Sequence, residues 1–175
     1  MFVRRDRYER RKMSHLPKRI LLATDGSEDA RLAAWAAASL SERAGAELHL
    51  GHAWQSVPHP VIDPGYYEEG ASKILEEETR FVSGTGGTVA EAHLVEDAPV
   101  DAILDLAEEI KANLVVVGSR GNGPIGRLLL GSVSEGVVHH ATCPVLVVRG
   151  EEGRGTGVGD RLSLWREQHP GARLP

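Results

Sequence analysis

Short apolar runs alternate along this chain with longer stretches whose apolar positions recur at helical spacing. Runs of about four to eight mostly apolar residues are typical of buried strands, and alternation of apolar with polar residues is typical of half-buried ones. Turn residues and glycines separate these runs from the helical stretches. The expected strands are residues 20–23, 47–54, 88–95, 114–117 and 144–148.

The stretches between the strands carry helix start and stop signals. Ser27 is a plausible N-cap for a first helix that Gly45 ends. Ser132 and Glu135, three residues apart, have the spacing of a capping box. The inner face of the first helix is expected to consist of Leu32, Trp35, Ala36 and Leu40, which makes Trp35 a core residue. Further helices are expected over residues 66–82, from Pro99 to about residue 110, and over residues 132–140.

Apolar strands alternating with helices predict an α/β fold with an open, mainly parallel, five-stranded sheet and helices on both faces. The 175 residues, 41% hydrophobic and 26% charged, fit one soluble domain. We expect that domain over residues 17–150. Residues 1–16 are Arg-rich and aperiodic and predict a disordered basic leader, and residues 151–175 predict a flexible tail.

Charge and cysteine content narrow the possible functions. A net charge of −5 argues against a general nucleic-acid-binding protein, which needs a basic face. Cys143 is the single cysteine, so no intrachain disulfide can form, and beside Pro144 it is expected to be a small buried hydrophobe. No apolar stretch approaches the ~20 residues of a membrane helix, and no apolar segment follows the basic start as in a secretory signal. We expect a cytoplasmic protein without membrane contact.

A glycine-rich loop follows the fourth expected strand. It contains Gly118 and Gly121 and ends at Gly131-Ser132, where the next helix begins. Glycines let the backbone approach phosphate oxygens closely, and the first N–H groups of a helix favour an anion. In open α/β sheets, ligands bind beyond the carboxyl ends of the strands, where the strand order reverses. The turn after the first strand, with Asp25, belongs to the same edge. The loop therefore predicts a phosphate site.

Two other interpretations of this loop remain. Each glycine can serve only a turn, and Ser132 can serve only as a helix cap. The segment Gly121-x-Gly123-x-x-Gly126 also satisfies the dinucleotide fingerprint, but Pro124 lies inside it and no acidic residue ends a strand about twenty residues later. A phosphate-binding Gly-Lys-(Ser/Thr) loop is absent from the sequence, and no base is obviously placed to activate water. We therefore expect at most slow ATP hydrolysis.

The histidines do not predict a metal site. His139 and His140 end a helix, where a favourable interaction with the helix C-terminus explains them. His49 and His52 are three residues apart in one expected strand, so their side chains point to opposite faces.

The loop nonetheless carries a recognisable pattern. Gly118-x-x-Gly121, nine residues and then Gly131-Ser132 match the ATP-binding motif of universal stress proteins, which have a Rossmann-like fold. The opening Ile-Leu-Leu-Ala-Thr-Asp, the His52-Ala53 pair ending the second strand, and the final Cys-Pro-Val-Leu-Val-Val also resemble that family. The resemblance covers residues 17–149. Asp97-Ala98-Pro99 stands where the family often has Gly-x-Pro, and the Pro-rich loop over residues 55–65 is particular to this chain.

The resemblance implies roles for individual residues. Ala23, Thr24 and Asp25 would line the ribose and metal side of the pocket, with Asp25 facing Mg²⁺ bound to ATP. Ala53 would meet adenine through its backbone. Val117 would flank the base or ribose, and Gly118 would hydrogen-bond the ribose. The residues implied around the phosphates are Gly121, Asn122, Gly131, Ser132 and Val133.

The leading hypothesis is an ATP-binding stress-response regulator with little or no hydrolysis. AMP or another adenine nucleotide is left open as the true ligand. The alternatives are a slow ATPase or NAD-dependent enzyme, and a nucleotide-free dimeric scaffold. The apolar last strand, Pro144 to Val148, would be an exposed edge if unpaired. The resemblance implies a homodimer formed through this strand.

Overall fold

The computed structural model describes residues 16–56, 63–121 and 130–150. Within them, strands and helices alternate strictly along the chain. Several predictions fall outside the described residues. These concern the leader up to residue 15, the tail from residue 151, the phosphate-site residue Asn122, and Gly123 and Gly126 of the dinucleotide pattern. The elements are β1 (Arg19–Ala23), α2 (Glu28–Ala44), β2 (Glu47–Trp54), α3 (Pro64–Gly84), β3 (Val89–Glu96), α4 (Pro99–Glu109), β4 (Leu114–Gly118), α5 (Ser132–His140) and β5 (Val145–Val148).

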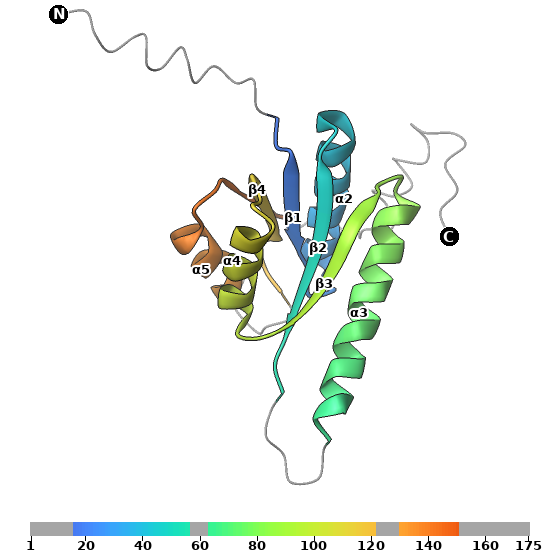
Figure 1. Ribbon diagram of the computed structural model, residues 1–175, viewed down its shortest axis with the longest axis vertical. Helices are drawn as coiled ribbons and strands as arrows, with labels where there is room; N and C mark the ends of the chain where they lie inside the picture. The colour runs from blue at the N-terminus through green and yellow to red at the C-terminus, as the bar shows by residue number, and fades with distance from the viewer. Residues whose placement is uncertain (1–15, 57–62, 122–129, 151–175) are drawn as a thin grey trace, which may run out of the picture.

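The strands form one parallel sheet in the order β3-β2-β1-β4-β5. The chain builds outward from β1 to β3, returns across the sheet, and then builds outward from β4 to β5. Helices α2 and α3 cover one face, and α4 and α5 cover the other (Figure 1). The predicted fold class is confirmed. None of the helices in the described ranges is both long and apolar enough to span a membrane.

Two hydrophobic cores fill the space between the layers, because alternate residues of each strand point to opposite faces. Ile20 and Leu22 of β1 point toward α2 and α3, and Leu21 and Ala23 point toward α4 and α5. Full burial of a Leu or Ile side chain contributes about 1.5–3 kcal/mol. The central strands therefore supply much of the stability of the fold.

The buried face of α2 differs from the expected one. Trp35 and Leu40 are 42% and 36% exposed, so the prediction of Trp35 as a core residue was wrong. The face against the sheet is a stripe of alanines at positions 30, 33, 34, 37 and 38. Alanine side chains are small enough to bring the helix axis close to the strands, which leaves the larger side chains at the rim.

Of the two predicted N-terminal caps, one is confirmed and one is wrong, although α5 begins at Ser132 as predicted. The Ser27 side chain accepts a hydrogen bond from the Ala30 N–H at 3.2 Å, as an N-cap does. Helix α5 has Gly131 as its N-cap residue and no side-chain cap bond. Ser132 is already inside the helix, so it forms no capping box with Glu135. The consequence is a helix N-terminus without a side-chain cap.

Candidate functional site

A cavity of about 230 Å³ opens beyond the carboxyl ends of β1, β2 and β4. It lies where the strand order reverses between β1 and β4, which is the ligand position in open α/β sheets. The structure brings together at this cavity every predicted site residue that it describes. These are Ala23, Thr24, Asp25, Ala53, Val117, Gly118, Gly121, Gly131, Ser132 and Val133.

The end of the cavity beside β2 is apolar. Gly51 and Ala53 of β2 face Pro99 and Ile103 at the start of α4. A Cβ on Gly51 would lie 2.9 Å from the end of the Leu106 side chain, which would have to shift to accept it. This end presents backbone edges and small apolar side chains, a surface suited to a flat heterocycle.

The opposite end of the cavity is polar and is formed by the start of α5. The intrahelical bonds of α5 begin with the Glu135 N–H, which donates to the Gly131 carbonyl at 2.9 Å. The N–H groups of Ser132, Val133 and Ser134 therefore have no acceptor within the helix, and no side chain among the described residues accepts from them. All three residues line the cavity. Amides without an intrahelical acceptor, at the positive end of a helix dipole, favour a negatively charged ligand.

Hydrogen bonds to the Ser119 carbonyl close the base of the glycine-rich loop. The Gly131 N–H donates to this oxygen at 2.8 Å, and the Ser134 hydroxyl donates to it at 3.0 Å. The Gly131 amide is therefore used within the protein. A Cβ on Gly131 would make contacts of 3.4 Å or more, so space alone does not require glycine here. The amide donors at this end come from the residues that follow Gly131.

The other side of the loop is anchored to α2. The Ser119 hydroxyl donates to the buried Asp29 carboxylate at 2.7 Å, and Arg120 pairs with the same carboxylate at 3.4 Å. These bonds join the end of β4 to the first turn of α2. They position the loop, and they place the Arg120 charge beside Asp29.

The turn after β1 is held from both sides. The Thr24 hydroxyl donates to Glu78 of α3 at 3.2 Å, and His52 Nδ1 donates to the Thr24 carbonyl at 2.7 Å. Glu78 is 1% exposed and also accepts from Arg31 Nε at 3.1 Å. The next residue, Asp25, accepts from the Ser27 N–H through Oδ1 and lies where a Cβ on Gly121 would collide with its carboxylate.

Sequence reasoning missed several residues that line or support the cavity. Pro99 and Ile103 begin an amphipathic helix directly after β3, and that position could have indicated them. Glu78 gave no signal, because it lies among other glutamates on a largely polar helix and only the tertiary contacts show that it is buried.

A comparison with protein families identifies the chain. The model of the "Universal stress protein family" matches residues 17–149, which is most of the chain. The chain belongs to the universal stress protein family. A universal stress protein in the QAH/OAS sulfhydrylase 3′ region of Thermus aquaticus is 41% identical over 136 residues, which cover 75% of this chain and 98% of that protein.

Solved universal stress protein structures are similar in fold. One in complex with cAMP is 29% identical, with a TM-score of 0.63 over 77% of this chain and 98% of that one. The universal stress protein UspA from Lactobacillus plantarum is 26% identical, with a TM-score of 0.66 over 75% of this chain and 97% of that one.

Proposed function

We propose that this universal stress protein binds ATP in the cavity and acts in the cytoplasm as a nucleotide-dependent stress-response regulator with little or no hydrolysis. The observation that carries the proposal is the start of α5, which no described side chain caps and whose first residues line one end of a cavity with an apolar opposite end. The solved relative in complex with cAMP supports an adenine nucleotide as the ligand class.

In the proposed complex, the parts of ATP would lie in order along the cavity. The adenine would lie between Ala53 and Ile103, with its edge toward the β2 backbone. The ribose would lie over Val117 and Gly118, beside Asp25. The phosphates would meet Gly121, Asn122 and the amides at the start of α5, Ser132 and Val133 among them.

Asp25 fits the role proposed for it toward Mg²⁺. It supplies one carboxylate at the phosphate side of the cavity, and Mg²⁺ usually takes one or two carboxylates and completes its shell with phosphate oxygens and water. The ion would neutralise phosphate charge and fix the geometry of the triphosphate chain.

The proposal of little or no hydrolysis rests on the charges at the cavity. Phosphoryl-transfer enzymes place cations and a water-orienting group at the γ-phosphate. Among the described lining residues, the cation is Arg120, and its guanidinium is paired with Asp29. We therefore propose binding rather than turnover as the function of the site.

The test is calorimetric titration of the nucleotide-free protein with ATP, AMP and NAD. We expect one ATP per chain and no NAD binding. Gly121→Val should weaken ATP binding at least ~10-fold, because its side chain would displace the Asp25 carboxylate. Gly70→Val is the matched control, since a Cβ at Gly70 meets nothing within 4 Å. A substantial rate of ATP turnover would favour an ATPase, and no response to any ligand would favour a scaffold.

The homodimer is a second part of the proposal. Strand β5 is an edge of the sheet, with half-buried side chains along its length. Such an edge tends to be covered in solution. A pair of chains joined through β5 would meet this need. We expect sedimentation equilibrium at micromolar concentration to give twice the chain mass of 18.9 kDa, and a monomer mass would contradict this.

A further inference from the structure

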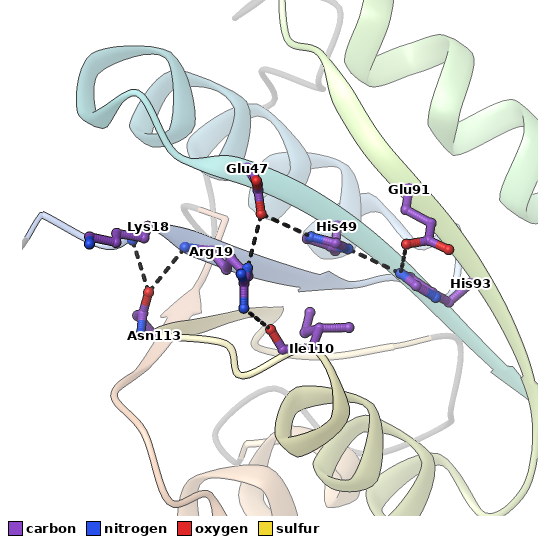
Figure 2. Close-up of polar contacts among 8 residues, drawn as sticks. All are labelled: Lys18, Arg19, Glu47, His49, Glu91, His93, Ile110 and Asn113. Carbon is purple, nitrogen blue, oxygen red and sulfur yellow. Dashed lines mark hydrogen bonds and ion pairs between the residues drawn. The ribbon is translucent and has the colours of Figure 1, made fainter.

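A second cluster of polar side chains lies on the α4 side of the sheet, outside the lining of the nucleotide cavity. His49 of β2 and Glu91 and His93 of β3 each offer one ligand atom, and these three atoms lie within 4.8 Å of one another. Figure 2 shows the three side chains gathered between the two strands, with Glu47 beside His49.

An irregularity in the pairing of β2 with β3 brings these residues to one face. Leu48 pairs with Val89, but the next residue, His49, pairs with Glu91, so Ala90 is an extra residue in β3. A bulge of this kind re-aims the side chains that follow it. Without it, Glu91 and His93 would point to the other face, away from His49.

The two imidazole rings form the centre of the cluster. His49 Nδ1 lies 3.1 Å from His93 Nε2, and a Glu91 oxygen lies 3.8 Å from the same His93 nitrogen. A tetrahedral zinc ion with Zn–N distances near 2.05 Å holds two ligand nitrogens about 3.3 Å apart. Ligation would require the two stacked rings to turn so that both lone pairs point to one ion, and the exposed Glu91 side chain to swing toward it.

The second nitrogen of His49 lies on the side of a carboxylate that could support ligation through the first. His49 Nε2 is buried and has no hydrogen-bond partner. Within the described residues, no other buried side-chain nitrogen or oxygen lacks one. Ligation through Nδ1 would leave the proton on Nε2, on the side of Glu47, whose carboxylate is 3.9 Å away and is held by Arg19. Histidine ligands usually donate their other ring N–H to such a carboxylate.

We propose that His49, Glu91 and His93 form a binding site for a zinc ion. Two imidazole nitrogens and one carboxylate suit zinc among divalent ions, whereas Mg²⁺ and Ca²⁺ prefer oxygen ligands alone. The Glu91 side chain is 64% exposed, so a fourth position is open to water or to a group from a partner. None of the three residues lines the nucleotide cavity, so the proposal does not rest on nucleotide binding.

The test is titration of untagged, full-length, nucleotide-free protein with ZnCl₂, and with CoCl₂ to record the visible bands of tetrahedral cobalt. We expect one tight zinc ion per chain. His93→Ala should weaken binding at least ~10-fold and remove the cobalt bands, because it deletes one ligand. Glu91→Gln should also weaken zinc binding. Because it changes an exposed side chain, it serves as the second variant if His93→Ala does not fold.

His139→Ala is the matched control, because it removes an exposed histidine from another part of the chain and should leave the affinity unchanged. Circular dichroism checks that each variant is folded. Either of two results overturns the proposal. One is no zinc binding by the wild-type protein. The other is undiminished affinity in folded His93→Ala or Glu91→Gln protein, which would mean that His49 and His93 form only a hydrogen-bonded pair.

Discussion

At Gly118, strand β4 passes so close to the start of α2 that no side chain fits between them. A Cβ on Gly118 would lie 2.8 Å from the backbone nitrogen of Ala30 and the backbone carbon of Asp29. Backbone atoms cannot rotate away as a side chain can. The first glycine of the motif therefore has a structural role besides its place at the cavity.

We expect Gly118→Ala to lower the free energy of unfolding by about 1–3 kcal/mol, because α2 and β4 must separate to accept the methyl group. The measurement is urea denaturation followed by circular dichroism. Gly70→Ala, on the exposed side of α3, is the control. It should give a free energy of unfolding equal to or slightly higher than that of the wild type. Equal stability of the Gly118→Ala and wild-type proteins would show that this contact is not as close as described.

Cys143 is half-buried against the core beneath α4 and α5. Burial raises the pKa of this thiol, against a smaller opposing effect of backbone hydrogen bonds. The thiolate is the reactive form, so less of it is present at neutral pH than in an exposed cysteine.

We expect iodoacetamide to alkylate Cys143 in the folded protein more slowly at pH 7 than in the urea-unfolded chain, where the pKa returns to its ordinary value. The difference should narrow as the pH rises through the raised pKa and the folded thiol ionises. Mass spectrometry of quenched samples measures both rates. Equal rates at pH 7 in the two states would contradict the burial of the thiol.

At the scale of the elements, helices α2 and α4 end with the same hydrogen-bond pattern but with different residues. At the end of α2, the Ala46 N–H donates to Ser41 and the Gly45 N–H to Glu42, with Gly45 at φ 63°. At the end of α4, the Ala112 N–H donates to Ala107 and the Lys111 N–H to Glu108. Lys111 has φ 54°, a left-handed conformation that favours glycine.

We therefore expect Lys111→Gly to raise the free energy of unfolding by about 0.5–1 kcal/mol. Relief of the left-handed strain, about 1–2 kcal/mol, exceeds the entropy that glycine adds to the unfolded chain. The matched change Gly45→Ala should lower stability by about 1 kcal/mol for the same reason. Thermal denaturation of the wild-type protein and both variants measures these differences in stability. A Lys111→Gly protein less stable than the wild type would contradict the explanation.

At the scale of the whole molecule, the fold could be predicted because its strands are short apolar runs. Residues 114–117 are entirely apolar, and a run this short, bounded by turn residues, is typical of a strand buried on both faces of a parallel sheet. The glycine-rich loop alone indicated a phosphate site between the end of β4 and the start of α5, whereas the individual cavity residues were implied by the resemblance to universal stress proteins.

Other features depend on packing that a local pattern does not contain. Trp35 has the spacing of a core residue, but the close approach of α2 selects the alanines beside it. The contact between His49 and His93 depends on one extra residue in β3, and nothing in the sequence around Ala90 predicts this change of register.

The measurement that tests the central claim most directly is a titration of isotope-labelled protein with ATP, followed by the backbone amide resonances in NMR spectra. If the start of α5 holds the phosphates, the amide signals of Ser132 and Val133 will shift and saturate at one ATP per chain. AMP will shift the signals near Ala53 as ATP does, but those of Ser132 and Val133 less. Saturable ATP binding that leaves the Ser132 and Val133 amides unmoved would contradict the account.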